Sequence, residues 1–250
     1  MVWGTFTLTH IITLLISAGA IVLSYHLLKN RSDKTKVTAL FIMSLFGIAG
    51  TAFNLFYWGS PIEYLPFHMC SINALLLPFT VLTKSKVMGN LTLIWSLGAA
   101  LALIFNYGQA HYTLDYVTFY FFYVPHTLEF AVPVLCIALK LIKFDFKNIV
   151  STSIITAAIY TAVHFINLGI NAYCIENNVV DWAGNVIRVN YMYSLGGEGN
   201  LILETFRSIL PYDYWYMYLA FPLIAVYLGA WHLGGVIKNK LSKKKVNIDE

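Results

Sequence analysis

The chain has 250 residues, of which 58% are hydrophobic and only 11% are charged, whereas an average soluble domain carries about 25% charged residues. This composition excludes an ordinary soluble enzyme and indicates a membrane protein. The net charge of +4 does not indicate nucleic-acid binding, because the cations are divided among short segments beside apolar stretches, where lipid headgroups are their expected partners.

Seven apolar segments along the chain are long enough to cross a bilayer, which takes about 20 helical residues. We therefore expect an all-α membrane protein with seven transmembrane helices, built as a single polytopic domain over residues 1–250. The predicted spans lie near 5–28, 37–58, 64–83, 88–107, 117–140, 149–172 and 213–237.

The cations follow every second predicted span and so fall on one side of the membrane. By the positive-inside rule this side is the cytoplasm, which predicts an N-terminus outside and a cytoplasmic C-terminus. The 14 cations on that side, of 16 in the chain, are Lys29, Arg31, Lys34, Lys36, Lys84, Lys86, Lys140, Lys143, Lys147, Lys238, Lys240, Lys243, Lys244 and Lys245.

The outer connection over residues 173–212 is the longest in the chain. Within it, "LILETFRSIL" (201–210) has the apolar spacing of a short amphipathic helix that lies along a membrane surface. Two interpretations stay open, a lid over an outer-leaflet site and a belt of interfacial aromatic residues over a simple loop.

Polar and reactive side chains of three predicted spans share one depth. Counted from the outer end of each span at about 1.5 Å per residue, His68 lies roughly 6 Å deep, Cys70 roughly 9 Å, His164 about 12 Å and His126 about 13 Å. Ionisable groups inside a membrane are costly and usually face the bundle interior. These four side chains therefore predict a site in the outer half of the bilayer.

The segment "PFHMCS" separates its two reactive residues. On a helix, two positions correspond to about 200° of rotation, so His68 and Cys70 are expected on nearly opposite faces. The base for Cys70 should then come from another helix, and His126 and His164 are both candidates. Asn73, one turn beyond Cys70, shares its face.

Two further polar patterns accompany these histidines. In "YVPHTLEF", His126 and Glu129 are three positions apart and share a face, which lets the carboxylate orient the imidazole. In "HFINLGINAY", His164, Asn167 and Asn171 repeat at helical spacing, and we expect this polar stripe to face away from lipid.

A thiol beside an imidazole is typical of nucleophilic catalysis, in which the sulfur carries an acyl group as a thioester. In that scheme Asn73 or Asn167 stabilises the oxyanion, and His68 contacts a lipid headgroup. A zinc site from His68, His126 and His164 is an alternative, although no paired-ligand motif supports it. The three cysteines form no disulfide framework, and one bridge, between Cys70 and Cys174, remains open.

Two function classes compete with an enzyme. Aligned His, Asn and Glu side chains can line a proton or solute path, which predicts a small transporter or channel. A lipid-binding membrane protein without catalysis uses the same residues and predicts tight binding without turnover.

The order of these motifs resembles the YwaF-like integral membrane proteins of bacteria, which are related to the eukaryotic transmembrane protein 164 acyltransferases. The resemblance rests on "LPFHMC", "YVPHTLEFAVP" and "VHF" between residues 64 and 171, and continues more weakly through "NYMYSL" to "YDYWYMYL". It implies a multi-pass protein of the bacterial plasma membrane that moves an acyl chain from a phospholipid to a lysophospholipid or lipid-like acceptor.

The resemblance also implies roles for particular residues. Cys70 becomes the acyl carrier with His126 or His164 as its base, and the "NYMYSL" segment adds Asn190 and Tyr191 to the candidate lipid-binding residues. We expect no cofactor, since the donor lipid carries its own activated ester.

Overall fold

The computed structural model describes residue 4, residues 6–105 and residues 113–246, the last nine of these by their backbone only. Thr5 and residues 106–107, predicted as the edges of the first and fourth spans, lie outside the described residues. Within the described part all regular elements are helices, with one isolated bridge between Val180 and Val186, which confirms the predicted all-α class. The α-helices are α1 (Leu8–Leu28), α2 (Asp33–Tyr57), α3 (Met69–Thr83), α4 (Lys86–Phe105), α5 (Val117–Ala138), α6 (Ile149–Glu176), α7 (Leu201–Ile209) and α8 (Ala220–Val246); the 3-10 helices are η1 (Pro61–Tyr64), η2 (Phe146–Asn148), η3 (Tyr191–Tyr193) and η4 (Trp215–Leu219).

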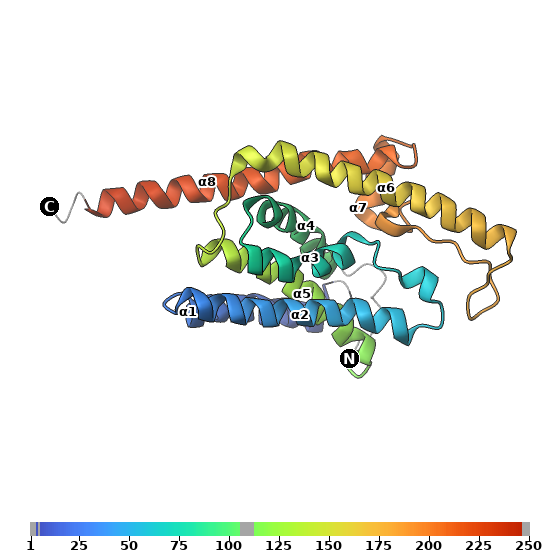
Figure 1. The fold of residues 1–250 in the computed structure, drawn as a ribbon, viewed down its shortest axis with the longest axis horizontal. Helices are drawn as coiled ribbons and strands as arrows, with labels where there is room; N and C mark the ends of the chain where they lie inside the picture. The colour runs from blue at the N-terminus through green and yellow to red at the C-terminus, as the bar shows by residue number, and fades with distance from the viewer. Residues whose placement is uncertain (1–3, 5, 106–112, 247–250) are drawn as a thin grey trace.

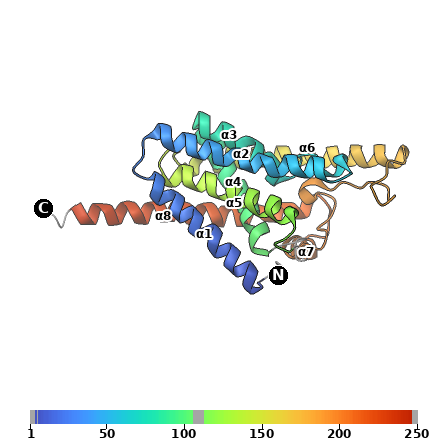
Figure 2. The same ribbon diagram turned by 90° about the horizontal axis from the view of Figure 1, so that it is seen from below.

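Helix α5 is the centre of the bundle, since it packs against α1, α2, α3 and α4. In Figure 1, α1 and α2 run along one side, α6 and α8 run along the other, and α3 to α5 lie between them. Figure 2 shows α8 continuing past the other helices toward the C-terminus. The turn between α1 and α2 lies at that same end of the molecule, and α7 with the segment after α6 lies at the opposite end (Figure 1).

Six described helices are long and apolar enough to cross a membrane. Helix α3 has only 15 residues. At its usual rise it is therefore about 22 Å long, shorter than the roughly 30 Å thickness of the hydrocarbon core. It begins at Met69 rather than near residue 64, which corrects the predicted start of the third span. The cause is Pro66, which disfavours a helical conformation at the preceding residue; Leu65 and His68 are both extended.

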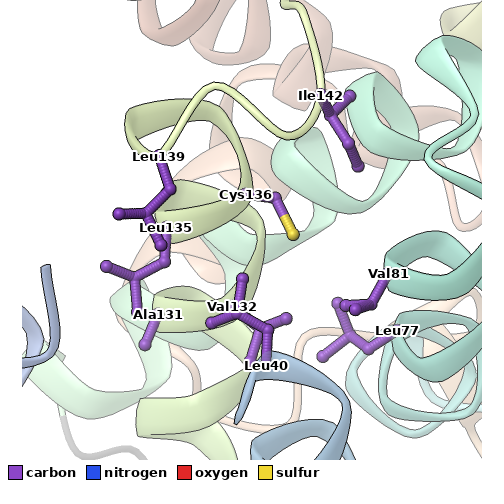
Figure 3. Close-up of a cluster of buried hydrophobic side chains, with 9 residues drawn as sticks. All are labelled: Leu40, Leu77, Val81, Ala131, Val132, Leu135, Cys136, Leu139 and Ile142. Carbon is purple, nitrogen blue, oxygen red and sulfur yellow. The ribbon is translucent and has the colours of Figure 1, made fainter. Parts of the chain in front are cut away.

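A buried apolar cluster joins α2, α3 and α5 (Figure 3). Cys136 lies inside this cluster with 1% of its surface exposed, in the environment of a small hydrophobic residue rather than of a reactive thiol. The cluster packs the C-terminal half of α3 against the C-terminal half of α5. The relative position of their N-terminal halves follows from this packing. Its buried members are Leu40, Leu77, Val81, Ala131, Val132, Leu135, Cys136, Leu139 and Ile142.

Gly50 allows α2 to approach α5 at the proline that precedes His126. A Cβ atom at Gly50 would lie 2.4 Å from Cγ of Pro125 and 3.0 Å from the carbonyl oxygen of Phe121. We expect Gly50→Ala to lower the free energy of unfolding by about 1–3 kcal/mol, because neither the proline ring nor the backbone can move aside cheaply.

Thermal unfolding of the detergent-solubilised protein checks this prediction against Gly19→Ala as the matched control. A Cβ atom at Gly19 has nothing within 4 Å, so that substitution should leave the melting temperature unchanged or raise it. Equal melting temperatures for the two variants would contradict the close approach of α2 and α5.

Candidate functional site

Cys70 lies in the first turn of α3, because that helix begins one residue earlier. It is therefore shallower in the helix than the count from residue 64 predicts. Hydrogen-bonding groups of Ser71 and of its own backbone face the partly buried thiol. The positive end of a helix stabilises negative charge on such a sulfur.

Helix α5 supplies a carboxylate and an imidazole to the same place. Glu129, with 2% of its surface exposed, interacts electrostatically with both His126 and Cys70. The predicted nucleophile and one of its two predicted bases thus both lie within electrostatic range of the same buried carboxyl group. The ring of His126 is oriented by a backbone group, since its Nδ1 lies 2.7 Å from the carbonyl oxygen of Phe122, whereas Glu129 acts on it through charge.

Two buried side chains around Cys70 have unsatisfied polar atoms. Neither Nδ2 nor Oδ1 of Asn73 has a hydrogen-bond partner among the described residues, and the same holds for Oε2 of Glu129. Buried polar groups in proteins are nearly always paired, so an orphaned one calls for an explanation. Asn73, fully buried, lies on the face of α3 that carries Cys70.

His68 is not part of a helix. It is the residue before α3, in an extended conformation, so the expected 200° separation from Cys70, which assumes a continuous helix, does not apply. Its Nδ1 accepts a hydrogen bond from the backbone N–H of Met192 at 3.4 Å, and its ring packs against Tyr191 and Tyr193. His68 therefore contacts the segment after α6 as well as the start of α3.

The polar stripe of α6 holds that segment in place. Asn167 accepts from the N–H of Tyr191 at 3.0 Å and donates to its carbonyl at 2.8 Å. One turn later Asn171 accepts from the N–H of Val189 at 2.7 Å and donates to its carbonyl at 2.9 Å. The stripe lies against this segment, and its amides pair with backbone.

The second predicted base, on α6, contacts this docked segment. Nδ1 of His164 lies 3.1 Å from Oγ of Ser194, and the same oxygen accepts from Nδ2 of Asn167 at 2.9 Å. The side-chain amide of Asn167 is hydrogen-bonded to three groups of the segment, the N–H and carbonyl of Tyr191 and the hydroxyl of Ser194. Asn167 therefore supports the site by holding this segment rather than by binding a ligand directly.

The other two predicted lipid-binding residues also hold the segment. Asn190 accepts from the N–H of Leu195 and donates to the carbonyl of Gly196 and to Glu198. Tyr191 is buried, and its hydroxyl donates to the carbonyl of Ile62. The sequence predicted both as lipid-binding residues and did not show that their side chains hydrogen-bond within the loop and to Ile62.

Two functional candidates were missed from the sequence, Ser194 and Tyr193. The Tyr193 side chain interacts electrostatically with Cys70, and burial, with Cys70 and Glu198 adding to it, raises the pKa of Tyr193 to about 12. Its hydroxyl therefore stays protonated at neutral pH and can donate. The only sequence signal for either residue is their place in "NYMYSL", where Met192 and Tyr193 adopt left-handed backbone conformations, which often occur at functional sites.

Two open alternatives are settled by the geometry. Cys70 and Cys174 are both free thiols, so the disulfide left open between them is absent. Among the residues that the structure describes, no three His, Cys, Asp or Glu side chains are placed to hold a metal ion, so the zinc arrangement of His68, His126 and His164 has no geometric support.

Comparison with known proteins gives one match. The model of the TMEM164 family matches residues 4–231, which include every candidate site residue. No curated protein and no solved structure matches the chain.

Proposed function

Because this chain belongs to the TMEM164 family, as its motifs predicted, we propose that it is a membrane-embedded acyltransferase. It moves a fatty acyl chain from one phospholipid to a lysophospholipid, or to another lipid-like acceptor, through a thioester on Cys70. The donor supplies its own ester, so the reaction needs no cofactor.

The unpaired polar atoms around Cys70 carry this proposal. Leaving a buried polar group unpaired costs about 1–3 kcal/mol, and both Asn73 and Glu129 bear such atoms beside the thiol. An ester carbonyl oxygen supplies the acceptor that Nδ2 of Asn73 lacks. Tyr193 offers a second donor to the same oxygen, on the segment that packs over His68.

The chemistry proceeds in two balanced steps. In the first, His126 or His164 takes the proton of the Cys70 thiol, the sulfur attacks the ester carbonyl, and an oxyanion forms that Asn73 stabilises. The C–S bond forms, the C–O bond breaks, and the departing lysolipid takes the proton from the imidazole. In the second, the hydroxyl of the acceptor gives its proton to the imidazole and its oxygen attacks the thioester carbonyl. The new C–O bond forms, the C–S bond breaks, and the leaving sulfur takes the proton from the imidazole, which regenerates the thiol.

The charge distribution supports a membrane arrangement for this site. In the proposed topology α3 counts as a seventh span, the N-terminus lies outside, the cationic end faces the cytoplasm, and Cys70 lies in the outer half of a bacterial plasma membrane. Non-helical backbone at membrane depth is tolerated where protein surrounds it, which accommodates Leu65 to His68 before α3.

The arrangement of α6 weighs against a transporter. A solute path needs polar groups that remain available along the bundle. The side-chain amides of Asn167 and Asn171 are instead hydrogen-bonded to the backbone of Tyr191 and Val189. The polar stripe that supported a path in the sequence is thus accounted for by the docking of the outer segment.

A transfer assay tests the proposed function. The purified full chain is incubated in micelles with a phospholipid bearing a deuterated acyl chain and an unlabelled lysophospholipid, and the lipids are analysed by mass spectrometry. We expect the label in the acceptor and an equal amount of new lysolipid from the donor. Release of the label only as free fatty acid would identify a hydrolase, and no release from several donor headgroups would contradict an enzyme.

A further inference from the structure

The hydrogen bond to the His126 ring fixes which of its nitrogens is basic. A carbonyl oxygen only accepts, so Nδ1 at 2.7 Å from the Phe122 oxygen must carry the proton. In the neutral ring the other nitrogen, Nε2, is then unprotonated. His126 is therefore held in the tautomer that can receive a proton at Nε2.

The contacts of His164 give the opposite result. The amide of Asn167 cannot be turned over, since the Tyr191 N–H must meet its oxygen and the Tyr191 carbonyl must meet its nitrogen. Its Nδ2 therefore donates to Oγ of Ser194. The Ser194 hydroxyl is fully buried, and Nδ1 of His164, at 3.1 Å, is the one acceptor among the described residues that its proton can reach, so we assign the hydroxyl as the donor to that nitrogen. With Nδ1 accepting, the neutral ring carries its proton on Nε2.

His68 shares this second tautomer. A backbone N–H only donates, so the bond from Met192 makes Nδ1 of His68 an acceptor and leaves the proton on Nε2. The segment after α6 thus fixes the tautomers of His68 and His164, through Met192 and Ser194 respectively. The backbone of α5 fixes the tautomer of His126.

We propose that His126 is the base of the site and that His164 and His68 are hydrogen-bond donors to oxygens of the bound lipid, with Ser194 and Asn167 as the positioning residues that hold His164 in its donor tautomer. This inference rests on the proposed function for its substrate, an oxygen-rich lipid ester, but the tautomers themselves follow from the protein alone. In the first step the proton of Cys70 passes to Nε2 of His126 and from there to the departing lysolipid oxygen.

Nuclear magnetic resonance of the full chain tests the tautomers without any turnover. The protein carries ¹⁵N-histidine in lipid nanodiscs, and the ring signals are assigned with His126→Gln and His164→Gln. We expect His126 protonated on Nδ1 and His164 on Nε2. Ser194→Ala removes the donor to His164 and should shift its ring toward the Nδ1 tautomer while His126 stays unchanged. Ser208→Ala, at an exposed serine of α7, is the control and should move neither signal.

Two results would overturn the assignment: His164 protonated on Nδ1 in the wild type, or a His164 signal that ignores Ser194→Ala. Both can arise whether or not lipids are substrates, so they are distinguishable from a failure of the proposed function.

Where the wild type forms an acyl-enzyme, the rate of its formation gives a second test. A glutamine amide replaces a donor but not a base, so His126→Gln should slow acylation at least about 100-fold, whereas His164→Gln should stay within roughly tenfold. The reverse order would assign the base to His164. A rate loss in His164→Gln confined to donors with a phosphate would place its donated bond on the headgroup, and an equal loss on diacylglycerol would place it on the ester.

Discussion

Cys70→Ala abolishes acyl transfer in this account, with an expected loss of at least about 1,000-fold, because removal of a covalent nucleophile leaves only the contribution of binding and oxyanion stabilisation. Alanine fits without strain in the first turn of α3, so the variant should fold like the wild type. The deuterated-lipid transfer assay measures the loss, and a melting curve on the same sample verifies that the protein is folded.

Cys136→Ala is the matched control, since Cys136 is a buried thiol on α5 inside an apolar cluster. It should retain transfer within a few-fold of wild type, although the small cavity lowers its melting temperature. Transfer by Cys70→Ala at the rate of Cys136→Ala would show that Cys70 is a packed thiol.

Asn167→Ala is expected to give the largest loss of stability among the site residues. It leaves the N–H and carbonyl of Tyr191 and the hydroxyl of Ser194 without the partner that each has in the wild type. At about 1–3 kcal/mol for each buried group that stays unpaired, and with relaxation of the segment, we expect a loss of about 3 kcal/mol. Hydrogen exchange should rise over residues 187–195 in particular.

Asn177→Ala is the matched control, because it removes an asparagine side chain at the end of α6 whose hydrogen bond is to that helix rather than to the outer segment. Asn177 follows α6 directly, is exposed, and bonds only to a carbonyl of the helix end. Its replacement should change stability by less than about 0.5 kcal/mol and leave exchange over residues 187–195 as in the wild type. Equal stability of the two variants would mean that the outer segment does not depend on the α6 amides.

Most helices could be predicted from hydropathy alone, because a membrane span must be both long and apolar. The predicted span over 117–140 matches α5 closely, and the segment "LILETFRSIL" forms the short helix α7. The third span was predicted too long. Apolar character does not distinguish helical backbone from extended backbone that protein surrounds. The chain directly before Met69 is extended.

The site could be predicted in part. Depth and helical spacing predicted that Cys70, His126 and Glu129 lie at one site, and in the structure Glu129 is near enough to both other residues to interact with them electrostatically. The role of the α6 asparagines could not be predicted, since their partners are backbone groups of a segment 18 to 24 residues away and backbone carries no sequence signature. For the same reason the tautomers of the histidines emerge only from the structure.

The outer segment has two consequences for the chemistry. It brings Tyr193 to Cys70 and fixes the rings of His68 and His164, so its docking assembles one wall of the site. Because Met192 and Tyr193 hold left-handed conformations that non-glycine residues rarely adopt, that wall depends on the asparagine pairs for its shape. Variants that weaken the docking should therefore lose transfer together with stability.

The most direct test of the account is the intact mass of the wild-type protein after brief incubation with a phospholipid that bears a deuterated acyl chain. We expect one added acyl group, removed by hydroxylamine and mapped to the peptide that contains Cys70. An unmodified mass while transfer proceeds would contradict a thioester at Cys70, as would an acyl group mapped to Cys136 or Cys174.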